Sequence, residues 1–180
     1  YRGQVFSDNI YTFDIETTSI FYKNGEYLLF DKTKSPKFYK DYEKIGFMYI
    51  WTFSINEHVV FGRTWDEFIE FLTALKNNMM GTLIIFVHNL GWEFQFMRNA
   101  IHDFEIFARQ ERHPMYAKSK SFHAEFRCSL IITNASLAKV PKMYHLSVEK
   151  LVGDLDYNVI RVPSTPMSPK NLGYCEHDCL

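Results

Sequence analysis

The sequence lacks an excess of charge of either sign. Its 20 lysine and arginine residues are balanced by 21 aspartate and glutamate residues, which gives a formal net charge of −1. Proteins that bind long duplexes usually concentrate positive charge on one face. The balance therefore argues against an extended duplex-binding surface, and a short bound strand remains compatible with it.

Long apolar runs and cysteine pairs are lacking as well. The longest apolar candidate, 83–87, is far below the roughly 20 residues that a transmembrane helix needs, so we expect no membrane partner. Three cysteines, Cys128, Cys175 and Cys179, are an odd number without the spacing of a disulfide framework, and no charged-then-apolar leader opens the chain. These absences favour a soluble protein in a reducing, cytoplasmic setting.

Apolar and aromatic residues, in contrast, are abundant. With 47% hydrophobic and 17% aromatic residues in 180 positions, the chain can bury the core of one domain, which we expect to span 1–180. Runs of β-favouring residues predict strands at 10–15, 46–55, 59–64 and 82–87, with 25–31 as a candidate partner of the first. Region 105–133 contains two or three further strand-like runs, of which 126–133 has the most buried pattern.

Helical spacing alternates with these strands. Thr64 opens a capping-box pattern with Glu67, and apolar periodicity predicts a helix at 65–77. We also expect helices at 92–101, after a three-residue turn, and at 171–180, which has helical composition. A hairpin followed by alternating strands and helices predicts an α/β fold, a ribonuclease-H-like mixed sheet flanked by helices.

A lysine- and tyrosine-rich stretch, 31–44, interrupts this pattern. Pro36 and the absence of apolar periodicity predict a loop or insertion without a core of its own. Aromatic residues stand between the lysines, which is the composition of a nucleic-acid-contacting loop, but Asp31, Asp41 and Glu43 dilute the charge. We favour a solvated insertion over a nucleic-acid contact.

Two acidic residues lie on the first predicted strand. Asp14 and Glu16 are two positions apart, so both side chains leave the same face of the sheet. Crowded carboxylates repel each other, and a divalent cation, which prefers such hard oxygen ligands, relieves the repulsion. A solvated strand end gives the same pattern, so this pair alone does not establish a metal site.

Two later segments carry acidic residues at positions that suit a site. Glu93 follows the carboxyl end of the buried strand 82–87, where open α/β sheets place ligands, although an acidic residue in a first helical turn also simply offsets the helix dipole. Tyr174 and Asp178 are four positions apart and share one face of the last predicted helix.

The order of these segments resembles that of the exonuclease domains of family B DNA polymerases. The segments similar to the Exo I, Exo II and Exo III motifs of that family are Asp14-Ile15-Glu16, Asn89-Leu90-Gly91-Trp92-Glu93 and Tyr174-Cys175-Glu176-His177-Asp178. Three further segments resemble the protein-primed branch found in phages and linear plasmids: His88-Asn89-Leu90, Ser136-Leu137 and Gly153-Asp154-Leu155-Asp156-Tyr157.

This resemblance implies an activity and a set of residues. The activity is a 3′→5′ exonuclease that trims single-stranded DNA from its 3′ end with two divalent cations, Mg²⁺ or Mn²⁺. The implied metal ligands are Asp14, Glu16, Glu93 and Asp178, with Tyr174 as the catalytic residue that orients the attacking water. The implied contacts to the strand come from Thr17, Asn89, Trp92, Ser136 and Leu137.

The resemblance also implies partners. A proofreading domain of this kind is an N-terminal fragment of a DNA polymerase, so its partners would be the polymerase domain of the parent chain and a terminal, or priming, protein. Such a protein acts in the cytoplasm of the cell that hosts the phage or plasmid.

Two positions depart from the family's pattern. The family has Phe or Tyr followed by Asp where this chain has Trp92 and Glu93, and it has a supporting Lys at Val152, for which Lys150 is the candidate replacement. A catalytically weakened module that binds single-stranded DNA or a priming protein is therefore the alternative function.

A zinc site is the rival chemistry. Its ligands would be Cys175, His177 and Cys179, since thiolates and imidazole bind Zn²⁺ well. We favour it less, because position 177 points away from the other two on a helix.

Overall fold

A long antiparallel pair of strands forms the spine of the protein in the computed structural model, which describes residues 3–147 and 155–180. The two strands are β1 (Tyr11–Lys23) and β3 (Glu43–Ile55). They belong to an eight-stranded sheet of order β4-β3-β1-β5-β8-β7-β6, with β2 paired to the outer end of β1. The other strands are β2 (Glu26–Leu28), β4 (His58–Gly62), β5 (Leu83–Val87), β6 (Phe104–Gln110), β7 (His113–Ser119) and β8 (Ala124–Cys128).

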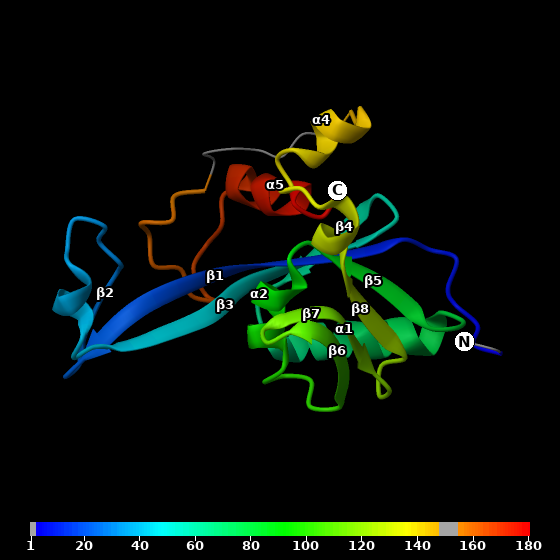
Figure 1. Cartoon of the computed structure of the whole chain (residues 1–180), viewed down its shortest axis with the longest axis horizontal. Helices are drawn as coiled ribbons and strands as arrows, with labels where there is room; N and C mark the ends of the chain where they lie inside the picture. The colour runs from blue at the N-terminus through cyan, green and yellow to red at the C-terminus, as the bar shows by residue number, and fades with distance from the viewer. Residues whose placement is uncertain (1–2, 148–154) are drawn as a thin grey trace.

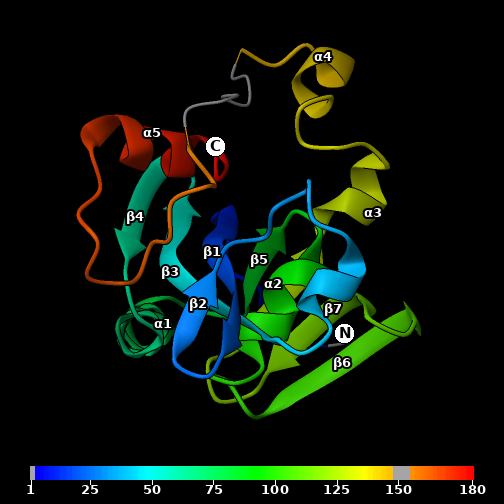
Figure 2. The same cartoon turned by 90° about the vertical axis from the view of Figure 1, so that its left-hand side faces the viewer.

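The sheet is mixed, as predicted. β5 runs parallel to both β1 and β8, whereas the pairs β1–β3, β3–β4, β7–β8 and β6–β7 are antiparallel. Helices lie on both of its faces (Figure 1, Figure 2). They are α1 (Trp65–Asn78), α2 (Leu90–Met97), α3 (Ser129–Thr133), α4 (Val140–Tyr144) and α5 (Pro169–His177), with a 3₁₀ turn η1 (Pro36–Tyr39). The predicted α/β class, a ribonuclease-H-like mixed sheet flanked by helices, is confirmed.

Each face of the sheet has its own apolar cluster. On one face, α1 and α2 cover the main core, which includes Phe13, Ile15, Phe68 and Leu90. The predicted capping box starts α1, because the Thr64 side chain accepts from the Glu67 amide while the Glu67 carboxylate accepts from the Thr64 amide. On the other face, α5 adds Tyr174 and Cys175 to a smaller cluster with Tyr49, Ile50 and Leu155.

Two predicted boundaries are wrong, and the first of them has a clear physical reason. The strand expected at 126–133 ends at Cys128 and continues as α3. Its partner β5 ends at Val87, which pairs with Cys128, so the residues beyond have no ladder to join, and Ile131 and Ile132 are exposed. The helix expected at 92–101 begins at Leu90 and ends at Met97.

The first predicted strand is much longer than expected. It continues from Ile15 to Lys23, and the candidate segment 25–31 does pair with it through β2. The outer ends of β1 and β3, together with β2 and η1, form residues 19–45, which we call the arm; it projects from the rest of the sheet on the left of Figure 1.

The arm contradicts the expectation that 31–44 lacks a core of its own. Tyr39 is only 6% exposed, and its ring lies 4.1 Å from the ring of Phe21 and 5.5 Å from that of Phe30 between centroids. Phe38 and Tyr42 extend this cluster. A sequence pattern hides the cluster because its rings come from three separate elements.

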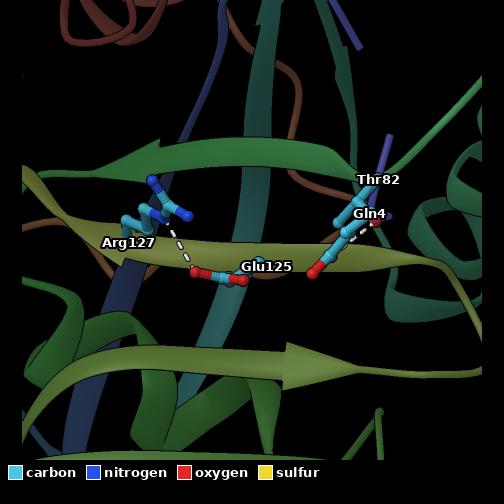
Figure 3. Close-up of polar contacts among 4 residues, drawn as sticks. All are labelled: Gln4, Thr82, Glu125 and Arg127. Carbon is cyan, nitrogen blue, oxygen red and sulfur yellow. Dashed lines mark hydrogen bonds and ion pairs between the residues drawn. The ribbon is translucent and has the colours of Figure 1, made fainter. Parts of the chain in front are cut away.

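The sheet also buries an acidic residue on β8. Glu125 on β8 is 2% exposed and accepts a 2.8 Å hydrogen bond from Nε of Arg127, while Gln4 donates to Thr82 and ties the N-terminal segment to β5 (Figure 3). The pairing explains the burial of Glu125, because a buried charge needs such a partner.

None of the described helices is long and apolar enough to span a membrane.

Candidate functional site

Three carboxylates converge between β1 and α5. Phe13 and Ile15 point into the main core, so the alternation of the strand sends Asp14 and Glu16 to the opposite face, towards α5. One ligand oxygen each from Asp14, Glu16 and Asp178 lies within 4.8 Å of the others. Three negative charges at that separation repel, and their oxygens are the ligands that hard divalent cations prefer.

The C-terminal end of α5 is fastened to the sheet beside these acids. The helix starts with Ser168 as its N-cap and Pro169 in its first turn, and it ends with Asp178 at the C-cap. The Thr12 hydroxyl donates a 2.6 Å hydrogen bond to the carbonyl of Cys179, and Thr52 Oγ1 lies 3.2 Å from Cys179 Sγ. These contacts fix the position of Asp178 relative to β1.

A β-bulge separates Glu16 from Thr17, where the register between β1 and β3 shifts. Bulges commonly redirect a side chain next to an active site. Beyond the bulge, the Thr18 hydroxyl donates to the carbonyl of Arg161 and binds the segment 155–161 over the strand. The bulge therefore marks the point where β1 passes from the carboxylates to the arm.

Glu93 lies in the first turn of α2 and is 4% exposed. Burial, with a further contribution from the negative charge of Glu16, raises the pKa of its carboxyl to about 8. Its Oε2 is buried and has no hydrogen-bond partner among the described residues. Glu93 thus lies near Glu16 but outside the group formed by Asp14, Glu16 and Asp178.

Backbone geometry accounts for two other residues of the Asn89–Glu93 segment. Asn89 precedes α2 in the left-handed conformation, with φ of 65°, which Asn adopts more easily than most residues. A Cβ on Gly91 would lie 2.6 Å from the carbonyl oxygen of Arg112, so only glycine permits this approach of α2 to the β6–β7 turn. The segment is therefore shaped to place Glu93 at the start of the helix.

Tyr174 is 5% exposed on α5, and its hydroxyl lies 3.1 Å from that of Tyr157. Burial raises the pKa of Tyr157, and the hydrogen bond to Tyr174 and the charge of Glu16 act in the same direction. Tyr157 is thus a neighbour of the acidic group that was not predicted as a site residue. Its only signal was its place in the segment Gly153-Asp154-Leu155-Asp156-Tyr157.

Two pockets contain the residues predicted to contact single-stranded DNA. The first, which we call the Ser136 pocket, has a volume of about 430 Å³ and brings together Asn89, Ser136 and Leu137. The second, the arm pocket, has a volume of about 840 Å³ and is lined by Glu16, Thr17, Trp92 and Tyr157 among others. All five residues predicted to contact single-stranded DNA therefore line one pocket or the other.

The remaining candidates are less well supported. Lys150 lies outside the described residues. All three cysteines are free and buried, and burial raises the pKa of the Cys179 thiol to about 12, which disfavours the thiolate that zinc requires. Within 3–147 and 155–180, the only group of three possible metal-ligating side chains is the one formed by Asp14, Glu16 and Asp178.

Comparisons with known proteins agree with the fold. No protein-family model and no curated protein matches the sequence. Among solved structures, the chain is similar to Phi29 DNA polymerase in a ternary complex with primer-template DNA and incoming nucleotides, with 16% identity and a TM-score of 0.66. It is likewise similar to that polymerase complexed with single-stranded DNA, with 17% identity and a TM-score of 0.67. Each alignment covers 95% of this chain and 29% of the polymerase, so the chain spans less than a third of its neighbour and shares the fold of that part.

Proposed function

We propose that this chain is a two-metal 3′→5′ exonuclease that hydrolyses single-stranded DNA from the 3′ end, as the proofreading domain of a protein-primed DNA polymerase. The observation that carries the proposal is the convergence of Asp14, Glu16 and Asp178, from the two ends of the sequence, on one point between β1 and α5. Structural likeness to Phi29 DNA polymerase, solved with single-stranded DNA, supports the choice of substrate.

The donor set fits Mg²⁺ or Mn²⁺. Asp14, Glu16 and Asp178 offer only carboxylate oxygens, which hard cations prefer over the softer ligands of zinc sites. The unpartnered Oε2 of Glu93 beside them is a further oxygen that a cation would satisfy. When bound, two such ions supply hydroxide from water and stabilise the departing 3′ oxygen.

The protein's own groups position the reactants. Tyr174 would orient the attacking water through its hydroxyl, which the hydrogen bond with Tyr157 holds in place. Burial raises the pKa of the Glu93 carboxyl to about 8, which favours its protonated form at neutral pH. A bound cation would lower that pKa, so Glu93 would then offer a carboxylate ligand.

The strand would occupy both pockets. Trp92 is 43% exposed in the arm pocket, which favours a base-stacking role for its ring over core packing. Thr17 lies beside it, and Asn89, Ser136 and Leu137 would hold the strand in the Ser136 pocket. Because the chain aligns with 29% of a polymerase, we further propose a polymerase domain as a partner. The motifs that resemble the protein-primed branch are the ground for proposing a terminal protein as well.

The proposal is tested by incubating a single-stranded oligonucleotide, labelled at its 3′ end, with the protein and Mg²⁺ or Mn²⁺. We expect metal-dependent release of labelled mononucleotide. Asp14→Ala should slow the release on the order of 10³-fold, because one lost ligand removes several kcal/mol of charge stabilisation. A strand blocked at its 3′ end should resist.

A matched control separates chemistry from folding. Glu70→Ala removes an exposed carboxylate from α1, on the opposite face of the sheet, and should cleave like the wild type. Equal release by the wild type and Asp14→Ala, or cleavage of the blocked strand from its 5′ end, contradicts the proposal.

The alternative is a module that binds single-stranded DNA or a priming protein without cleaving it. The position of Glu93 outside the three-carboxylate group favours this alternative. Tight strand binding without metal-dependent release, in either Mg²⁺ or Mn²⁺, would establish it.

A further inference from the structure

The arm contributes to the same pocket as the candidate catalytic residues. Leu29, Phe30 and Lys32 line the arm pocket together with Glu16 and Tyr157. Figure 1 shows the arm and the segment that begins at residue 155, drawn in orange, on the same side of β1. Residues of both line the arm pocket. The arm is thus continuous with the site rather than a separate appendage.

Hydrogen bonds order the turn at residues 31–33 of the arm. The Asp31 amide donates a 2.7 Å hydrogen bond to the hydroxyl of Tyr39, the buried ring of the arm. The Asp31 carboxylate in turn accepts from both the amide and the hydroxyl of Thr33, at 2.8 and 2.7 Å. This turn holds Lys32 at the pocket wall, so its position is fixed by the backbone on both sides.

Lys23 and Lys34 of the arm have partners away from the arm pocket, whereas two other cations line it. Lys23 pairs with Asp41 at 3.7 Å, and Lys34 lies 5.4 Å from the centre of the Phe38 ring. Lys32 and Arg161 both line the arm pocket, and within the described parts of the chain neither has an acidic partner. Arg161 is only 6% exposed, so its charge is buried against the pocket with a carbonyl, that of Asp156, as its hydrogen-bond acceptor.

An exposed ring completes the arrangement. Phe30 is 55% exposed although it packs at 5.5 Å against Tyr39, so one part of the ring is held while the rest is open to the pocket. A volume of about 840 Å³ lies in the range of about 300–1,000 Å³ that is typical of small-molecule sites and is large enough for a nucleotide. Cations without acidic partners beside open rings match the chemistry of a single nucleic-acid strand.

We propose that the arm is a clamp for single-stranded DNA: the nucleotide next to the scissile phosphate stacks on Phe30, and its phosphate lies between Lys32 and Arg161. This inference rests on the proposed function, since it takes the strand as the substrate. It departs from the sequence-based preference for a solvated insertion at 31–44.

The test measures binding apart from cleavage, with a fluorescent oligothymidylate in EDTA, by anisotropy at several salt concentrations. Lys32→Gln should weaken binding roughly 5- to 10-fold and reduce the slope of log affinity against log salt by about 0.7. Phe30→Leu, which keeps an apolar side chain against Tyr39, should weaken binding at least roughly 5-fold. Lys34→Gln, a lysine of the same segment outside the pocket, should bind like the wild type.

The outcomes separate the clamp from the exonuclease. If Lys32→Gln and Phe30→Leu bind as tightly as Lys34→Gln, the clamp is wrong, whether or not the wild type releases nucleotides. If both weaken binding while the wild type releases none in Mg²⁺ or Mn²⁺, the proposed exonuclease fails and the arm stands as a strand-binding site. Lys32 is exposed, so its substitution leaves the fold intact and both results interpretable.

Discussion

The two halves of β1 differ in what surrounds them. The inner half, Tyr11–Glu16, lies between β3 and β5 and contributes Tyr11, Phe13 and Ile15 to the main core. The outer half, Thr17–Lys23, pairs only with β3 and β2 and is supported by the aromatic cluster of the arm. One strand therefore brings carboxylates together at one end and carries the projecting arm at the other.

The bulge after Glu16 marks the boundary between the two halves. Carboxylates that share a metal need a rigid support, because a displacement of about 1 Å can cost on the order of 10²-fold in rate. A strand clamp tolerates adjustment, because stacking and phosphate contacts are less demanding in geometry. We expect substitutions around the inner half to change catalysis or global stability, and those in the arm to change binding and local opening.

Of the changes that distinguish the two halves of β1, Glu93→Gln, near the inner half, should have the largest effect on the free energy of unfolding. The pKa of the Glu93 carboxyl is about 8 in the folded protein, against 4.5 as its ordinary value. The folded state holds the proton of Glu93 more tightly than the unfolded state does. The contribution of this proton to the free energy of unfolding is therefore fully present below about pH 4.5 and is lost as the pH rises towards 8. Without metal, the wild type should lose about 2–3 kcal/mol between pH 6 and 9 that Glu93→Gln retains.

Urea unfolding in EDTA at several pH values measures this difference. Glu70→Gln, which changes an exposed acid of α1, is the control and should follow the wild type. Parallel pH profiles of the wild type and Glu93→Gln would mean that the Glu93 carboxyl ionises as it does in water.

A smaller effect is expected from Tyr174→Phe on α5. The substitution keeps the ring in its cluster but removes the hydroxyl that lies 3.1 Å from that of Tyr157. If the hydroxyl orients the attacking water, single-turnover cleavage should slow roughly 10- to 100-fold while the affinity for the strand stays within about twofold. Equal turnover in the two proteins would remove Tyr174 from the mechanism, and an equal loss of affinity would assign it to strand binding instead.

Much of the inner half could be predicted from sequence, because its signals are local. Two patterns each depend on a single element: the alternation around Asp14 and Glu16, and the four-residue spacing of Tyr174 and Asp178. The structure brings the carboxylates of Asp14, Glu16 and Asp178 together. The capping box at Thr64 and Glu67 is equally local. The predicted metal, activity and residue roles stay predictions, since a geometry of donors does not test them.

The arm could not be predicted, because its signals are not local. The cluster around Tyr39 joins rings from β1, the segment after β2 and η1, and no periodicity within 31–44 shows that they meet. The end of β8 at Cys128 is set by the length of β5, a different strand. Tyr157 reaches the site through the contact of its hydroxyl with Tyr174, 17 positions later in the sequence, and Arg161 lines the arm pocket.

Two Tyr→Phe changes, one in the inner half of β1 and one in the arm, should have the smallest effects. Together they test most directly whether the sheet and the arm unfold separately. Tyr11, at the start of the inner half, is fully buried, and its hydroxyl lies 2.7 Å from that of Ser7 and accepts a bond from Asn9. Tyr11→Phe should lower the free energy of unfolding by about 1 kcal/mol, the typical net value of a lost hydrogen bond. Tyr39→Phe removes the acceptor of the Asp31 amide. We expect the arm to open without unfolding the sheet, so this change should leave global stability within about 0.5 kcal/mol. It should instead speed amide exchange at Asp31 several-fold and weaken strand binding about twofold, as measured by hydrogen exchange and anisotropy. A loss of global stability in Tyr39→Phe as large as that in Tyr11→Phe would show that the arm and the sheet unfold as one unit.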